Sequence, residues 1–238
     1  MAIGDQDTFL IICQKTVREC RLAAPSLTPT PTTVLNQIGQ LRKIIDWVTE
    51  AWVEIQNLGD DWRFMRQEVS FPVIDGQLEY TTAQCNVAAG TFGHWLLDTF
   101  RCYKTSVGFP GEIPMAALDY DTWRNWYKFS TMRTAKSQPY YVTQLPNNGL
   151  GLGPCPLTGY TVYGDLYTAP VRLKADAEIP TLPIKHSSMV IVYKAMMSYA
   201  ESEAKMELFG RGQRGFQRLM GILERDQLPR PHLCGALR

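Results

Sequence analysis

Apolar residues recur every three or four positions between residues 34 and 58, the spacing that keeps side chains on one face of an α-helix. The stripe consists of Val34, Ile38, Leu41, Ile45, Val48, Trp52 and Ile55, and it is widened by Ile44, Trp47, Ala51 and Leu58. So broad an apolar face has to be buried, within the subunit, between subunits or both. The pattern therefore predicts a long helix over 34–58 that serves assembly.

The helical period predicts three more helices. The first spans residues 7–23. The helical spacing returns from about residue 186 and ends near residue 227, because Pro229 prevents the helix from continuing. The glycine-containing segment 209–212 is expected to divide this last stretch into two helices.

Between the helical stretches the pattern changes to the alternation of short strands, separated by glycine and proline turns. Asp75-Gly76 has the sequence of a tight hairpin turn between two of these strands. A short aromatic helix is expected over 119–127. The expected strands are 68–73, 77–80, 95–107, 113–118, 140–144, 150–152 and 159–167. Short strands of this kind are typical of an antiparallel sandwich or barrel-like sheet.

The order of these elements predicts an α+β fold with a discontinuous helical bundle. Helices from both ends of the chain form the body, comprising residues 1–66 and 184–228. The antiparallel β sandwich or barrel-like region, residues 67–183, is inserted into that body. Residues 229–238 contain two prolines and are predicted to form an extended C-terminal tail.

The composition is that of a folded soluble protein, with 45% hydrophobic and 20% charged residues in a chain of 238. No apolar stretch reaches the roughly 20 residues of a membrane span. The first residues lack the basic start of a signal peptide, so we expect no membrane partner. Six scattered cysteines without a C-x-x-C motif favour reduced, buried thiols in a cytosolic setting and no zinc site.

Two patterns that resemble catalytic or cofactor motifs lack the surroundings that such motifs need. The glycines at 149–153 resemble a dinucleotide-binding loop, but Pro154 and Pro156 follow where that loop requires a helix. Ser202 and Lys205 match an acyl-enzyme motif whose partner motifs are missing. We therefore expect neither enzymatic activity nor a cofactor or metal.

The order and spacing of several motifs resemble the head-to-tail adaptor (connector) proteins of tailed bacteriophages. The resemblance covers residues 34–228, in which the long amphipathic helix ends in Asp-Trp-Arg-Phe-Met at 61–65 and leads into a strand and the Asp-Gly turn. The later motifs are Leu-Gly-Pro-Cys-Pro at 152–156, Tyr-Thr-Val-Tyr at 160–163, Tyr-Thr-Ala-Pro at 167–170 and Ile-Pro-Thr-Leu-Pro at 179–183. The final helix from residue 186 follows them.

This resemblance implies a non-enzymatic virion protein that forms a ring, expected to be a dodecamer that matches the portal. The ring would join the portal to a tail or nozzle protein, and genomic DNA would pass through its channel without sequence-specific binding. The helical body would face the portal and the β part the tail, and the C-terminal tail would reach onto the portal. The subunit would be made in the host cytoplasm and reside at the portal–tail junction of the virion.

The C-terminal end is basic, with six arginines against two acidic residues between residues 211 and 238. Because arginine pairs bidentately with carboxylates, we assign this end to portal docking. The alternative that these arginines form only a solvated face stays open. The same arginines could instead line the DNA channel, but a channel through which DNA moves should not bind phosphates tightly. The assigned docking residues are Arg211, Arg214, Arg218, Arg225, Arg230, His232, Leu233 and Arg238. Contacts between subunits or with the tail are assigned to Trp47, Trp52, Trp62, Trp123 and Trp126.

Two other functions remain open. The basic C-terminal helix could bind DNA, and a steep loss of affinity with salt would reveal it. The aromatic residues near 120–129, together with Arg124 and Lys128, favour a core or an interface but could stack on bases or sugars. The β region would then be a ligand-binding module or an enzyme, against which stands the lack of any convergent His/Asp/Glu or Cys/His set.

Overall fold

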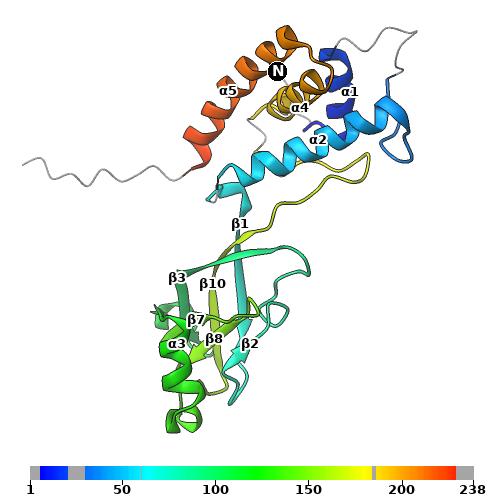
Figure 1. The fold of residues 1–238 in the computed structure, drawn as a ribbon. Helices are drawn as coiled ribbons and strands as arrows, with labels where there is room; N and C mark the ends of the chain where they lie inside the picture. The colour runs from blue at the N-terminus through cyan, green and yellow to red at the C-terminus, as the bar shows by residue number, and fades with distance from the viewer. Residues whose placement is uncertain (1–5, 21–29, 60, 184–185, 229–238) are drawn as a thin grey trace, which may run out of the picture. The chain divides into compact units, whose positions relative to one another are not determined.

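The computed structural model describes residues 6–20, 30–59, 61–183 and 186–228, and the chain forms two compact units (Figure 1). One unit is helical and comprises Met1–Phe64 and Pro170–Arg238, and the other is β-rich and comprises Met65–Ala169. The chain therefore passes from one unit to the other twice. Helices together with mainly antiparallel sheets confirm the predicted α+β class.

The helical unit is built around α4 (Met189–Ser202), which contacts α1 (Phe9–Glu19), α2 (Gly39–Asn57) and α5 (Met206–Gln227). Figure 1 shows these helices gathered around α4. A helix enclosed on several sides has few positions left for polar residues, which explains the nearly continuous apolar sequence of α4. Its buried residues are Val190, Ile191, Val192, Ala195, Met196, Tyr199 and Ala200.

The first helix is shorter than predicted. It begins at Phe9, with Thr8 as the capping residue whose hydroxyl accepts a hydrogen bond from the Ile11 amide at 3.4 Å. It ends at Glu19, and residues 21–23 of the prediction lie outside the described residues. The face that packs into the unit contains Phe9, Ile12, Cys13, Thr16 and Val17.

The second helix begins five residues later than predicted, at Gly39. Gly39 and Asn36 adopt φ angles of +63° and +54°, left-handed conformations through which a right-handed helix cannot run. The start of the predicted stripe is therefore divided. Val34 is buried and its amide donates to the Asp176 carboxylate at 2.6 Å, whereas Ile38 is 85% exposed. The remainder of the stripe packs inward through Ile44, Ile45, Val48, Ala51, Trp52 and Ile55.

The break between the last two helices lies at residues 203–205 and not at the predicted segment 209–212. Ala204 adopts a φ angle of +52°, which ends α4. Helix α5 then continues through the glycines that were expected to interrupt it. A Cβ atom at Gly212 or Gly215 would lie within 3.0 Å of an α4 side chain, so these glycines let the two helices pack closely. The sequence prediction therefore mistook Gly212, a glycine that lets the helices pack closely, for part of a helix break.

Residues 170–183 belong to the helical unit, although the predicted insertion extended to residue 183. The Gln56 side chain of α2 holds this returning segment, because its amide group donates to the Val171 carbonyl and accepts from the Val171 amide, both at 3.0 Å. Leu173 and Leu182 are buried in the same segment. The segment forms no strand, and its two buried leucines complete the helical core.

Within the described residues, the β-rich unit contains two four-stranded sheets and one two-stranded sheet. The first sheet is antiparallel, with the order β1 (Arg66–Pro72), β10 (Tyr160–Thr168), β3 (Phe92–Lys104) and β4 (Ile113–Pro114). The second has the order β2 (Glu79–Tyr80), β8 (Leu150–Gly153), β7 (Tyr141–Gln144) and β5 (Ala116–Ala117). Residues from both sheets share one apolar core that includes Phe71, Tyr80, Trp95, Phe100, Val142, Leu150, Val162 and Leu166.

Two parallel pairings in this unit were not predicted. Strand β5 pairs in parallel with β7, and β6 (Lys136–Ser137) pairs in parallel with β9 (Cys155–Pro156). The strand expected over 113–118 is divided into β4 and β5, which belong to different sheets. Short 3₁₀ turns at Arg63–Met65, Phe109–Gly111 and Thr131–Thr134 complete the secondary structure.

The Asp75-Gly76 turn is real, but it does not form the predicted hairpin. Strand β1 pairs with β10 and β2 pairs with β8, so the turn carries the chain from one sheet to the other. Gly76 adopts a φ angle of +77°, which explains the glycine at this position. The Tyr80 hydroxyl accepts a hydrogen bond from the Ile74 amide at 2.9 Å and helps to fix the turn. Local turn chemistry predicts the bend, whereas strand pairing depends on distant residues.

The predicted aromatic helix is present as α3 (Tyr120–Trp123) and a π-helical turn, Arg124–Lys128. The Asp119 carboxylate caps α3 by accepting the Thr122 amide at 3.0 Å. The Trp123 indole donates to the Leu152 carbonyl at 3.0 Å and fixes the element against β8. Gly151 leaves room for this ring, because a Cβ atom there would lie 2.8 Å from it.

We predict that Gly151→Ala destabilises the chain by about 1–3 kcal/mol, because the added methyl overpacks the slot filled by Trp123. The matched control is Gly221→Ala in α5, where a Cβ atom meets nothing within 4 Å. That variant should gain about 0.5–1 kcal/mol, because alanine favours the helix interior over glycine. Chemical denaturation followed by tryptophan fluorescence measures both. Equal stability of the two variants would show that the slot is not tight.

Candidate partner-binding surfaces

An arginine stripe runs along the solvent side of α5. Arg211, Arg214, Arg218 and Arg225 follow one another at intervals of three, four and seven residues, so they share one side of the helix over roughly 21 Å. All four are exposed. We call them the arginine face. Other positions of the helix turn into the unit, where Gly212, Met220, Leu223 and Gln227 are buried.

Most of the arginine face is not neutralised by other residues that the structure describes. Arg211 forms an ion pair with Glu19 of α1. Arg214, Arg218 and Arg225 have no hydrogen-bond or ion-pair partner in the part of the chain that the structure describes. A guanidinium carries its donors in a planar fork that suits a carboxylate. The face can therefore bind an acidic surface without first breaking internal contacts at these three residues.

The other predicted docking residues, Arg230, His232, Leu233 and Arg238, lie outside the described residues, as does the rest of the predicted tail.

Three of the five tryptophans assigned to interfaces are core residues instead. Trp52 is 1% exposed, and Trp62 and Trp123 are fully buried. The indole nitrogen of Trp62 donates to the Ile55 carbonyl at 3.1 Å, so its polar atom is satisfied inside the unit. Large aromatic side chains bury much apolar area, and these three positions stabilise the units rather than face a partner. Sequence spacing alone does not distinguish a core stripe from an interface stripe.

The remaining two tryptophans reach the surface to different degrees. Trp47 is partly buried and packs edge-on against Tyr199 of α4, with 5.9 Å between ring centroids. Trp126 is 50% exposed. It lies in the π-helical turn, and its ring packs in a T-shaped arrangement against Tyr127 and Tyr141, at centroid distances of 6.5 and 6.4 Å. Trp126 is therefore fixed by its contacts with Tyr127 and Tyr141, while half of its surface remains exposed to solvent.

Exposed apolar residues continue beyond Trp126 along residues 124–134, which we call the aromatic segment. Phe129 is 62% exposed and Met132 is 47% exposed. The Arg124 guanidinium lies 4.7 Å from the centre of the Phe129 ring, and the Ser130 hydroxyl accepts the Met132 amide at 3.2 Å. The sequence drew attention to these aromatics, but it did not separate the buried pair Trp123 and Tyr127 from the exposed residues.

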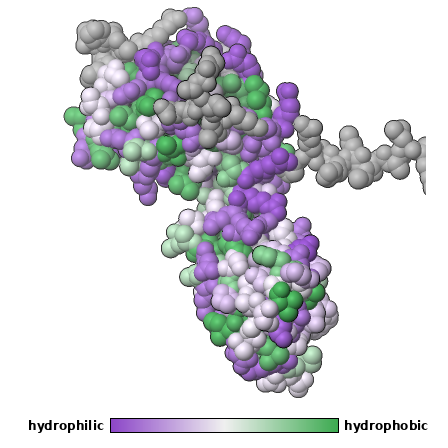
Figure 2. All heavy atoms as spheres, turned by 180° about the vertical axis from the view of Figure 1, so that it is seen from behind, coloured by the Kyte–Doolittle hydropathy of each residue, from purple (hydrophilic) through white to green (hydrophobic). Residues whose placement is uncertain are grey.

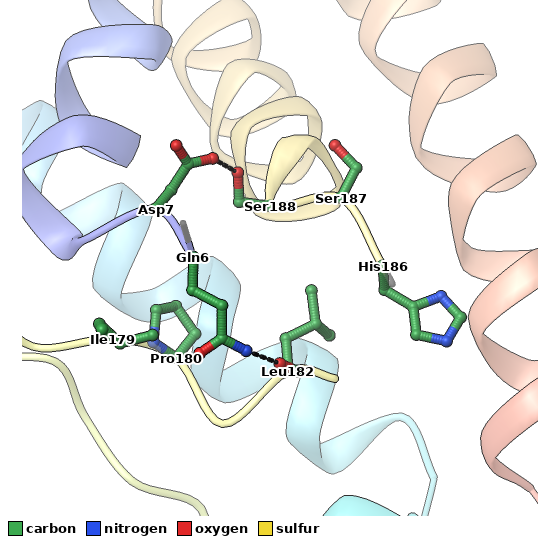
Figure 3. Close-up of a pocket in the computed structure, with 8 residues that line it drawn as sticks. All are labelled: Gln6, Asp7, Ile179, Pro180, Leu182, His186, Ser187 and Ser188. Atoms are coloured by element: carbon green, nitrogen blue, oxygen red, sulfur yellow. Dashed lines mark hydrogen bonds between the residues drawn. The ribbon is translucent and has the colours of Figure 1, made fainter. Parts of the chain in front are cut away.

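A hollow of about 190 Å³ in the helical unit brings together a histidine, two serines and an aspartate (Figure 3). The Ser188 hydroxyl donates to the Asp7 carboxylate, which also pairs with Lys15. His186 is turned toward Asp226, with 2.9 Å between its Nε2 atom and the carboxylate. Neither serine is hydrogen-bonded to the histidine, so the arrangement does not form a nucleophile–base pair. These contacts instead fasten the start of α4 to α5 and to the segment before α1.

The ionisation of Asp7 reflects two opposing influences. Burial raises the pKa of this carboxyl, but the hydrogen bonds from Lys15 and Ser188 outweigh that effect, and the net pKa lies below the ordinary value of 3.8.

The five described cysteines are buried and free. Burial raises the pKa of Cys13, Cys20, Cys85 and Cys102 to about 12, so these thiols stay protonated and unreactive.

Metal and membrane sites were searched over the described residues. No group of three or more His, Cys, Asp or Glu side chains in them is arranged to hold a metal ion. None of their helices is both long and apolar enough to cross a membrane.

Comparison with known protein families identifies the relatives of this chain. The model of the SU10 adaptor protein family matches residues 21–232, which is most of the sequence. This confirms the resemblance to phage head-to-tail adaptors that the motifs indicated. A comparison with curated proteins found no match.

We predict that Asp7→Asn lowers the free energy of unfolding at pH 7 by about 1–2 kcal/mol, because the charged hydrogen bonds to Lys15 and Ser188 are lost. A carboxyl whose pKa is lowered by folding stabilises the protein above its unfolded value, and that contribution disappears as the pH falls through the folded pKa. The difference from the unmodified chain should therefore shrink below pH 3.8. Urea denaturation at several pH values measures it.

The control is Asp46→Asn, which removes an exposed ion pair with Arg42 on α2 and should change stability by less than about 0.5 kcal/mol. A pH-independent loss in Asp7→Asn would contradict the role given to the ionised carboxylate.

Proposed function

The chain belongs to the SU10 adaptor protein family and is a phage structural adaptor, and we propose that it forms a ring between the portal and the tail of the virion. Adaptors of this kind contact portal and tail proteins in general. The ring has twelve copies to match the portal, and its channel lets genomic DNA pass. The subunit is made in the host cytoplasm, and its role requires neither catalysis nor a cofactor.

The arginine face is the observation that carries portal docking. Three of its guanidiniums have no partner among the described residues, and the sequence adds Arg230, His232 and Arg238 shortly after the end of α5. Arginines that are fixed on a rigid helix and free of internal ion pairs favour a partner surface rich in carboxylates. We assign that partner to the portal, with Leu233 adding an apolar contact.

Apolar residues left at the surface of the helical unit support ring formation. Ile38 is 85% exposed, and Leu35 and Leu58 are 54% and 59% exposed, close to the two ends of α2. Figure 2 shows one face of the chain, with green apolar atoms between purple polar atoms on both units. In a ring, each copy uses two different surfaces to contact its two neighbours. Leu35, Ile38 and Leu58, with the exposed part of Trp47, are the residues we assign to those contacts.

DNA binding by the same arginines is the second candidate, because an unpaired arginine face also attracts phosphates. We favour the portal, since strong phosphate contacts would retard DNA that has to move through the channel. The ligand-binding alternative is weaker. Trp123 and Tyr127, two of the aromatic rings that could have stacked on a sugar or base, are buried in the β-rich unit.

We predict that Arg214→Gln/Arg218→Gln weakens binding of the full-length chain to purified portal by at least about tenfold, because two unpaired guanidiniums are removed. Pull-down at several protein concentrations measures the affinity. The matched control is Arg42→Gln/Lys43→Gln, which removes two exposed positive charges from α2 of the same unit.

Portal binding equal to that of the unmodified chain would refute the docking role of the arginine face. A parallel titration with duplex DNA separates the second candidate. If the arginine variant loses DNA retention at low salt but keeps portal binding, the face serves DNA and not the portal.

A further inference from the structure

We infer that the aromatic segment of the β-rich unit is the docking site for an acidic, apolar segment of the tail-side protein. This inference rests on the proposed function, because it assumes that a tail protein binds this adaptor. It adds the site and the chemistry of the partner. The site consists of Trp126, Phe129 and Met132, flanked by Arg124 and Arg133.

The π-helical turn explains why Arg124 and Phe129 lie together at the surface. Residues five apart in a regular α-helix are separated by about 140° around the axis, which would place Phe129 far from Arg124. In this structure the Phe129 amide donates to the Arg124 carbonyl at 3.1 Å, and the Arg124 guanidinium lies over the Phe129 ring. π-Helical turns are rare in proteins, and those that occur are frequently found at functional sites.

The exposed residues rest on a rigid base. Trp123 and Tyr127 point inward and fill slots beside Gly151 and Gly153, where a Cβ atom would lie 2.8 Å and 2.5 Å from the respective rings. Trp126 packs above them, against Tyr127 and Tyr141. The fold therefore commits buried aromatic area to hold Trp126 and its neighbours at the surface. Ordering these side chains beforehand lowers the entropic cost of binding.

The charge around the segment specifies an acidic partner. No aspartate or glutamate occurs between Asp121 and Asp165, whereas the same stretch contains four basic residues. Two of them are already neutralised, since Lys128 pairs with Glu79 and Lys136 pairs with Asp75. Arg124 and Arg133 have no carboxylate partner among the described residues. A partner that places carboxylates opposite these two guanidiniums completes the pairing.

A protein fits this site better than a nucleic acid. Only two cations remain for phosphate contacts, and because affinity for nucleic acid grows with the number of such contacts, so few give weak binding. Tryptophan, phenylalanine, methionine and arginine are the residues enriched at protein interfaces, and tryptophan and arginine are common hot spots. The arginine face lies on the helical unit, which we assign to the portal. The aromatic segment lies on the β-rich unit, which is left for the tail.

The test compares full-length variants for binding to tails purified from the same phage and to purified portal. Trp126→Ala/Phe129→Ala should bind tails at least about tenfold more weakly while portal binding stays unchanged and the chain remains folded. Val107→Ala/Phe109→Ala is the matched control, because both residues are more than half exposed elsewhere on the β-rich unit. Arg133→Glu, at an exposed position outside the core, should weaken tail binding without any change in folding. Excess poly-L-glutamate should compete with tails for the unmodified chain.

Each other outcome overturns the inference in a recognisable way. If both aromatic and arginine variants bind tails normally, the segment is not the site, and the proposed function stands. If the variants lose ring formation alone, the occupant is a second copy of the chain, and if they lose only duplex DNA retention it is nucleic acid. If the unmodified chain binds portal but not tails, the proposed function itself fails in its tail-side half.

Discussion

The burial of α4 against α1, α2 and α5 is the interaction on which the rest of the structure depends. It joins elements from both ends of the sequence into one helical unit, and it therefore requires the intervening residues to leave that unit and return. The return is secured at Pro170–Leu182, where Gln56 holds the backbone of Val171 and two leucines enter the core. Without this shared core, no burial of apolar surface would hold the helices from the two ends of the sequence together.

In this architecture the residues that stabilise the two units differ from those proposed to bind partners. Trp52, Trp62 and Trp123 are buried and stabilise the units. The indole nitrogens of Trp62 and Trp123 donate hydrogen bonds to backbone carbonyls inside those units. The exposed residues of the arginine face and of the aromatic segment lie outside these cores. An adaptor with separate surfaces on its two units can lose one contact and keep the other, which makes each contact testable by itself.

Much of the fold follows from the sequence, because helical and strand periods are local signals. The α+β class, the helices and most strands of the β-rich unit were predicted in this way, with ends that differ by several residues. The errors have a common physical origin in contacts that are distant in sequence. Gly212 is interpreted as part of a helix break until α4 is seen packed against it, and Asp75-Gly76 is interpreted as a hairpin turn until the partners of β1 and β2 are known.

The candidate surfaces were predictable only in part. The spacing of Arg211, Arg214, Arg218 and Arg225 places them on one side of a helix, but their exposure and missing partners require the fold. The aromatic cluster was visible in the sequence, whereas its division into buried and exposed residues depends on a π-helical turn. Such a turn leaves no simple pattern, because it changes the register by one residue.

Electron microscopy of the full-length chain mixed with purified portal tests the central claim most directly. The account predicts a closed ring stacked coaxially on the portal, with the helical unit against the portal and the β-rich unit pointing away. Portal particles that remain bare at saturating chain concentration, or a ring that meets the portal through its β-rich unit, would contradict it.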